Sequence, residues 1–360
     1  MIYLGLALLG GLLIAGIPLL NRWGRQRAAV SKLAILSPRG VVEERYVRIG
    51  GIDQWVGIRG EDGENPVLLV LHGGPGCSYT IFTPHMRGWE KHFTIVQWDQ
   101  RGSGRSFGRC GMQGSGNLSF EQLVSDAEEV AEYARRRMGK ERIFLLACSQ
   151  GSTFGMRVAR RRPDLLYAYI GTDQNVSMRR GREEGHWEVV ERLRGLGLVK
   201  GTQEMERIGP DPVSWTVADY EAVARWTMRS DPAGYGRTME MLKNAVWHAP
   251  HWSLRDVRTF VKGMRYSLER LLPEMVTFDA WEEGVRFEIP FFILQGERDV
   301  LTTPLLARAF FEDVIAPEKR FGVIANAGHF AASLQPEEFL RQLLMHVRPL
   351  ANEARPTAMA

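Results

Sequence analysis

The sequence predicts an α/β fold in which helices flank a mostly parallel central sheet. Short apolar runs typical of buried strands, such as 67–71, 93–97 and 142–146, alternate with helical patterns over most of the chain. Three short polar motifs each follow such a run directly. With 360 residues, of which 44% are hydrophobic, the chain is long enough to bury a large core as one main domain with an insertion.

The first motif, at residues 147–151, has the sequence Ala-Cys-Ser-Gln-Gly. A helical pattern begins after Ser149 and ends before Pro163, which predicts a sharp strand-to-helix turn with the serine at its tip. Gly151 and Gly155 are small enough to let the strand and the helix approach closely. A serine hydroxyl is a poor nucleophile until a base accepts its proton, so a histidine and an orienting acid are expected elsewhere.

The two other motifs contain an acid and a histidine. Gly-Glu-Arg-Asp at 296–299 and Asn-Ala-Gly-His at 326–329 each follow an apolar run. Of the eight histidines, His329 alone follows a predicted strand late in the chain; Glu297 is the alternative to Asp299 as the acid. Serine, acid and histidine stand in the order of an α/β-hydrolase triad. The predicted nucleophile, orienting acid and general base are therefore Ser149, Asp299 and His329.

A glycine-rich loop predicts an oxyanion hole. His-Gly-Gly-Pro-Gly at 72–76 follows the apolar run 67–71. In α/β-hydrolases the loop after this strand supplies one backbone N–H, and the residue after the nucleophile supplies the other. Fixed N–H dipoles stabilise the negative charge that develops on the substrate carbonyl oxygen. The expected donors are the backbone N–H groups of Gly74 and Gln150.

A fourth motif makes the resemblance more specific. Residues 98–106, Trp-Asp-Gln-Arg-Gly-Ser-Gly-Arg-Ser, follow a predicted strand, and together with 72–76 they resemble the proline iminopeptidase branch of the α/β-hydrolase superfamily. The resemblance covers roughly 43–172 and 289–349. It implies a serine hydrolase in which Ser149, Asp299 and His329 form the triad, with Gly74 and Gln150 as oxyanion donors. The segment 99–106 is expected to be a tight turn, held by Asp99 and Arg101, beside the site.

The chain departs from that family at the substrate-binding positions. The nucleophile motif is Ala-Cys-Ser-Gln-Gly-Ser, where these peptidases usually have Gly-Gly-Ser-Trp-Gly-Ser, and no clear Trp-x-x-Trp-Glu segment is present. In the family that segment helps to hold the free amino terminus of the substrate. Candidate substrate-binding residues near the start of the insertion are Glu183, Glu184 and Trp187, with Glu188 as a further carboxylate.

The alternation of strands and helices stops at about residue 178. Amphipathic helical patterns replace it, which predicts a helical lid at 178–288, inserted after the sixth strand. The main domain is then formed by 42–177 and 289–350, and 351–360 are expected to be a disordered tail. The shape of the lid is expected to decide the substrate.

The N-terminal stretch predicts a membrane anchor. Residues 2–20 contain no charge, and about 20 apolar residues can cross a bilayer as one helix. A transmembrane helix is therefore expected at 1–21, followed by a linker at 22–41. Four basic residues follow the apolar run: Arg22, Arg25, Arg27 and Lys32. By the positive-inside rule, the hydrolase domain would face the cytoplasm of a single-pass membrane protein.

Composition excludes several other functions. The net charge is +4, but no basic stripe with interleaved aromatic residues indicates nucleic-acid binding. Three cysteines, at 77, 110 and 148, are too few and too scattered for a disulfide framework or a zinc site. No cofactor or metal is expected. The predicted function is a serine hydrolase of a small molecule or short peptide, most similar to a proline iminopeptidase; a carboxylesterase or lipase and a non-catalytic binding protein are the alternatives.

Overall fold

The computed structural model describes the backbone of residues 2–353 and the side chains of residues 17–352. Its sheet contains eight strands in the order β1-β2-β4-β3-β5-β6-β7-β8. The strands are β1 Val41–Ile49, β2 Ile52–Gly60, β3 Val67–Leu71, β4 Thr94–Asp99, β5 Ile143–Cys148, β6 Leu166–Thr172, β7 Phe291–Gly296 and β8 Lys319–Ile324. The pairs β1–β2 and β2–β4 are antiparallel, and all other neighbours are parallel. The predicted α/β architecture with a mostly parallel sheet is confirmed.

Thirteen α-helices accompany these strands in the described part of the chain. Those outside the lid are α1 Ile2–Lys32, α2 Gly104–Gly114, α3 Phe120–Arg137, α4 Gln150–Arg161, α10 Pro304–Asp313, α11 Ala331–Leu334, α12 Pro336–Gln342 and α13 Leu350–Glu353. Those between β6 and β7 are α5 Met178–Gly195, α6 Val199–Ile208, α7 Val217–Arg229, α8 Pro232–Trp247 and α9 Leu254–Thr277.

The sheet is covered on both faces, which explains why its central strands are continuous apolar runs. Every residue of β3 and β5 is buried, as expected for parallel strands between two layers of helices. Helices α3, α4 and α10 pack on one face. The 3₁₀ helix Tyr79–Met86 and helix α12 contribute to the hydrophobic core on the other.

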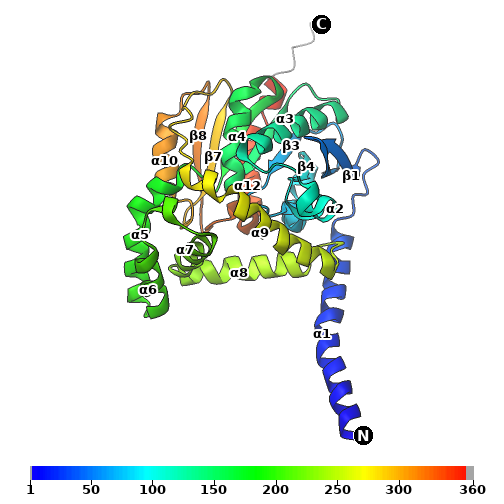
Figure 1. Ribbon diagram of the computed structural model, residues 1–360. Coiled ribbons are helices and arrows are strands. Elements are labelled where there is room, and N and C mark those ends of the chain that lie inside the picture. Colours follow the sequence, from blue (N-terminus) through cyan, green and yellow to red (C-terminus); the bar gives the residue numbers. More distant parts are fainter. Residues whose placement is uncertain (1, 354–360) are drawn as a thin grey trace.

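The lid is a helical layer over the end of the sheet where α4 begins (Figure 1). It has a small core of its own, built from Val190, Leu193, Met205, Val223 and Trp226 among others. The helices therefore occupy the insertion predicted at 178–288, and the last of them ends at Thr277. Residues after α9 return to β7 through an irregular connection.

The N-terminal helix extends beyond the predicted anchor into the predicted linker. Helix α1 continues to Lys32, so most of the predicted linker at 22–41 is helical, and Figure 1 shows α1 extending away from the body of the molecule. Its C-terminal part is held by the lid, because Arg22 and Gln26 both donate to the carbonyl of Trp252. Across the described residues, no helix has the length and apolarity to cross a membrane. The side chains of 2–16, on which most of the anchor prediction rests, lie outside the described set.

The predicted disordered tail is corrected at its start. Residues 350–353 form α13, and 354–360 lie outside the described residues.

Candidate active site

Ser149 occupies the sharp turn that the sequence predicts between β5 and α4. Its backbone has φ 51° and ψ −124°, a left-handed conformation that is unusual for a residue with a side chain. Close packing holds the turn: a Cβ on Gly151 would lie 2.5 Å from the Leu71 carbonyl oxygen, and one on Gly155 would lie 2.7 Å from Ala147 Cβ. The small residues around Ser149 are therefore a steric requirement of the elbow.

The three predicted triad residues meet in one hydrogen-bonded chain. His329 Nε2 lies 2.9 Å from Ser149 Oγ, and His329 Nδ1 lies 2.9 Å from Asp299 Oδ2. Asp299 stands three residues after β7, and His329 stands five residues after β8. The alternative acid, Glu297, is exposed and accepts a hydrogen bond from the Asn326 backbone instead. The choice of Asp299 over Glu297 thus agrees with the geometry.

Asp299 is surrounded by donors that favour its charged form. Oδ1 accepts from the backbone N–H groups of Leu301 and Thr302, and Oδ2 accepts from Gln295 Nε2 and Thr302 Oγ1 besides His329. Burial by itself would raise the pKa of Asp299, but the charge on His329 and these hydrogen bonds bring the pKa below its usual value. The carboxylate is therefore ionised and fixed in orientation.

A second buried carboxylate, Asp173, lies beside the histidine and was missed by the sequence reasoning. It directly follows β6 and accepts a hydrogen bond from the Ala331 backbone, two residues beyond His329. Burial raises the pKa of Asp173 to about 6. Burial would lower the pKa of His329, but Asp299 and Asp173 together raise it. The signal was present in the sequence, because Asp173, like Asp299, is an acid just beyond an apolar run.

Asp173, Asp299 and His329 form the only group of potential metal ligands found among the described residues. Single ligand atoms of Asp173, Asp299 and His329 lie within 4.8 Å of one another. However, His329 Nδ1 is already engaged by Asp299 and Nε2 by Ser149. Both ring nitrogens of His329 are therefore already used by the hydrogen-bonded chain from Ser149 to Asp299.

The two predicted oxyanion donors lie at the nucleophile. Gln150 is the first residue of α4, so its N–H has no partner within the helix. Gly74 lines the same cavity as Ser149 and has φ +130°, a conformation that favours glycine. The adjacent Gly73 packs so closely that a Cβ there would lie 2.8 Å from Ser149 Cβ. No acceptor in the described part of the chain takes the N–H of Gly74 or of Gln150.

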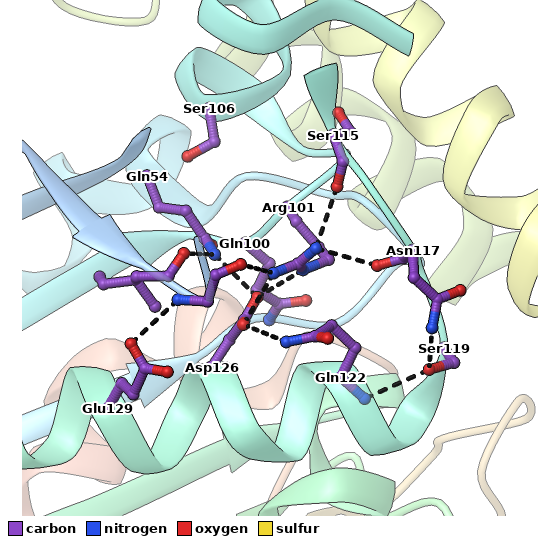
Figure 2. Close-up of polar contacts among 12 residues, drawn as sticks. Gln54, Gln100, Arg101, Ser106, Ser115, Asn117, Ser119, Gln122, Asp126 and Glu129 are labelled. Carbon is purple, nitrogen blue, oxygen red and sulfur yellow. Dashed lines mark hydrogen bonds and ion pairs between the residues drawn. The ribbon is translucent and has the colours of Figure 1, made fainter. Parts of the chain in front are cut away.

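The predicted tight turn after β4 supports this loop from behind. His72, at the start of the loop, receives hydrogen bonds from Gln100, whose backbone N–H donates to Nε2 and whose side chain donates to the His72 carbonyl. The next residue, Arg101, forms a buried ion pair with Asp126 of α3. Figure 2 shows the Arg101 side chain between Asp126 and the loop that contains Ser115 and Asn117. The turn is structural, as expected.

A cavity of about 710 Å³ opens above Ser149 between the sheet and the lid. Its lining includes Glu184 and Glu188, but neither Glu183 nor Trp187. Glu183 pairs with Arg179 on the surface, and the Trp187 side chain is 53% exposed. Of the three predicted substrate-binding residues, the structure therefore places only Glu184 at the cavity.

Comparison with known proteins places the chain in a family. The model of the alpha/beta hydrolase fold family matches residues 66–336, which is more than half of the chain. The chain belongs to the α/β-hydrolase family. It is therefore a hydrolase. Ser149 lies at the strand-to-helix turn where α/β-hydrolases carry their nucleophile.

Named relatives of this α/β-hydrolase include peptidases. The chain is 26% identical over 309 residues to the probable aminopeptidase YbaC of Bacillus subtilis, covering 84% of this chain and 96% of the relative. It is 27% identical over 177 residues to a proline iminopeptidase of Saccharolobus solfataricus, covering 46% and 55% respectively. The predicted resemblance to the proline iminopeptidase branch is confirmed.

A solved structure with the same fold is the proline iminopeptidase of Mycobacterium smegmatis. Its TM-score is 0.58 at 19% identity, and the match covers 87% of this chain and all of that chain (100%). At this identity the similarity concerns the fold.

Proposed function

We propose that this hydrolase cleaves an ester or amide bond through an acyl-enzyme on Ser149. The observation that carries the proposal is the chain of two 2.9 Å contacts from Ser149 Oγ through the His329 ring to Asp299. A binding protein without catalysis would have no need for a serine in a strained elbow, a histidine aligned with it and an ionised acid behind the histidine.

In the acylation step, His329 Nε2 accepts the Ser149 hydroxyl proton while Oγ forms a bond to the substrate carbonyl carbon. The carbonyl electrons move to the oxygen, and the backbone N–H groups of Gly74 and Gln150 stabilise this oxyanion. His329 then donates the proton to the leaving nitrogen or oxygen, and the bond to the leaving group breaks. Asp299 holds the ring with Nδ1 protonated and stabilises the imidazolium that forms transiently.

Deacylation repeats these steps with water. His329 takes a proton from the water molecule, whose oxygen attacks the acyl carbon, and the same two N–H groups hold the second oxyanion. Return of the proton to Ser149 Oγ releases the carboxylic acid and restores the enzyme. Each N–H donor is expected to contribute about 10²–10³-fold to the rate, as measured for one such donor in another serine hydrolase.

The proposed substrates are short peptides, from which the enzyme would release N-terminal residues. The relatives named as peptidases support this choice. Glu184 supplies a carboxylate at the cavity that could pair with a substrate ammonium group, and it has no partner among the described side chains.

A carboxylesterase acting on small esters is the second candidate. The observation that favours it is the apolar lining of the cavity, which includes Met178, Val189, Trp215, Val223 and Leu306. Glu184 is also exposed, so water screens its attraction for an ammonium group.

A substrate panel separates the two candidates. Aminoacyl-naphthylamides and 4-nitrophenyl esters would be compared with wild type and with Ser149→Ala, which controls for background hydrolysis. An aminopeptidase loses turnover when the amino group of its substrate is acetylated, whereas an esterase does not depend on an amino group. Hydrolysis of every substrate by Ser149→Ala at the wild-type rate would contradict both candidates.

A further inference from the structure

An arginine of the lid faces the cavity without a carboxylate partner. Arg182, on α5, is half-buried and lines the same cavity as Ser149 and His329. Its one hydrogen bond in the described part of the chain runs from Nη1 to Thr227 Oγ1, at 3.0 Å. A guanidinium carries five N–H donors, so most of its donors are left for something else.

The other arginines of the same helix show that this is unusual. Each pairs with a carboxylate: Arg179 with Glu183, Arg180 with Asp279, Arg192 with Glu188, and Arg194 with Glu191 and Glu206. Ion pairs at exposed positions contribute little. Arg192 also lines the cavity, but Glu188 pairs with it there, so Arg182 is the one arginine of α5 without a carboxylate partner among the described residues.

The buried Arg101 shows how this fold treats a guanidinium that only has a structural role. It makes five hydrogen bonds, two to Asp126 and three to backbone carbonyls. A charge removed from water costs free energy unless it is paired and hydrogen-bonded. Arg101 meets that requirement within the protein, whereas Arg182 does not. Consistently, burial lowers the pKa of Arg182.

A second free donor stands beside Arg182. Tyr220, on α7, lines the cavity, and its hydroxyl has no hydrogen-bond partner within the described residues. Tyr220 and Arg182 line the same cavity, and Arg182 donates to Thr227 of the helix that carries Tyr220. Burial raises the pKa of Tyr220, and the charge of Arg182 lowers it in part. The nearby carboxylate of Asp299 is already held by four residues, so it is not free to pair with Arg182.

We propose that Arg182 and Tyr220 form a subsite for an anionic group of the substrate, a carboxylate or a phosphate. The preferred substrates are then small esters or amides with an apolar body and an anionic end, which the apolar lining and the volume of the cavity can hold. Guanidinium groups suit both anions because two parallel N–H donors match two oxygens. This subsite rests on the proposed function, since it selects substrates for Ser149.

Matched substrates test the subsite. Three 4-nitrophenyl esters would share one eight-carbon acyl chain and differ only at its far end, which carries a carboxylate, a phosphate or the methyl ester of the carboxylate. Wild type is expected to show kcat/KM at least about tenfold higher for one of the anionic esters than for the neutral one, a ratio typical of a hydrogen bond to a charged group. The ester with the higher kcat/KM shows whether the subsite prefers a carboxylate or a phosphate.

Substitutions of Arg182 and Tyr220 test whether these residues cause the preference for anionic esters. Arg182→Met is expected to remove the preference, Arg182→Lys to keep part of it, and Tyr220→Phe to reduce it. Arg179→Gln is the matched control, because it removes a positive charge from the same helix outside the cavity and should leave the preference unchanged. Equal kcat/KM for the charged and neutral esters with wild type, or a full preference in Arg182→Met, would overturn the proposal.

Two further measurements keep this test separate from the test of the chemistry. A neutral fluorophosphonate probe should label wild type and Arg182→Met alike, which shows that Ser149 still reacts. Labelling of wild type without any preference for an anion contradicts the subsite alone, whereas absent labelling contradicts the proposed function. If Arg182→Met does not fold, inhibition of wild type by suberate compared with its uncharged diamide decides, and equal inhibition overturns the subsite.

Discussion

His329 Nε2 lies 2.9 Å from Ser149 Oγ, although 180 residues separate the two in the chain. The contact exists because β5 and β8 end at the same edge of the sheet, with β6 and β7 between them. The left-handed backbone of Ser149 raises its side chain above that edge. Phe330, which follows the histidine, is also left-handed and turns the chain into α11. The hydrogen bond between Ser149 and His329 is thus flanked by two residues with unusual backbone conformations, Ser149 and Phe330.

Asp299→Asn is expected to lower kcat by about four orders of magnitude, the loss seen when a triad acid becomes an amide. The amide can donate to His329 Nδ1 and so favours the tautomer in which Nε2 carries the proton and cannot accept one from Ser149. Steady-state kinetics on the best substrate measure this loss. Glu297→Gln is the control, because Glu297 is exposed; an equal loss in that variant would contradict the assignment of Asp299.

Asp173→Asn is expected to move the acid limb of the pH profile of kcat/KM to lower pH. His329 must be neutral to act as a base, so activity falls as the pH decreases through its pKa. Asp173 raises that pKa, and removing its charge lowers it, while the asparagine oxygen can still accept from the Ala331 N–H.

The profile is measured from pH 5 to 10 and compared with that of Asp164→Asn, which removes a carboxylate at the surface. An unchanged limb in Asp173→Asn, or the same shift in both variants, would show that Asp173 does not act on the histidine.

Asp126→Ala is expected to lower the free energy of unfolding by about 3–5 kcal/mol, since it leaves the buried guanidinium of Arg101 without its counter-charge. Urea unfolding followed by tryptophan fluorescence measures the change. Glu121→Ala breaks the exposed pair with Arg161 and should cost about 1 kcal/mol or less. Similar losses in the two variants would refute the structural role of the turn after β4.

Gly151→Ala is expected to lower both kcat and thermal stability, because its Cβ would lie 2.5 Å from the Leu71 carbonyl oxygen and force β3 away from the elbow. Gly195→Ala, near the end of α5, meets no atom within 4 Å and should be neutral or slightly stabilising. The melting temperature and kcat are measured for both. Wild-type values for Gly151→Ala would mean that the elbow is not sterically constrained.

Much of the site could be predicted because its residues are tied to buried strands. Ser149, Asp299 and His329 each follow an apolar run. Their order along the chain (serine, acid, histidine) is enough to predict the role of each in a triad. Asp173 follows such a run too, but the order of the triad leaves no place for a second acid. Only the neighbouring positions of β6 and β7 in the sheet bring it to the histidine.

The lid shows where sequence reasoning ends. Periodicity indicates helices at 178–288 but not which face of α5 looks into the cavity. Arg182 faces it, whereas Glu183 and Trp187 point to the surface. That choice depends on how α5 packs against α7 through contacts such as the one from Arg182 to Thr227. The hydrophobic periodicity of one helix does not predict its contacts with another helix.

The predicted linker at 22–41 contains the C-terminal part of α1, which ends at Lys32. Hydrogen bonds from Arg22 and Gln26 to the turn between α8 and α9 hold this part of the chain against the lid.

Labelling of Ser149 tests the central claim most directly. Wild type would be treated with a fluorophosphonate probe, digested and analysed by mass spectrometry, alongside Ser149→Ala and His329→Ala. The account predicts one adduct on Ser149 in wild type, none in Ser149→Ala, and labelling slowed by at least about 10³-fold in His329→Ala, which lacks the base. Equal labelling of wild type and Ser149→Ala would contradict it.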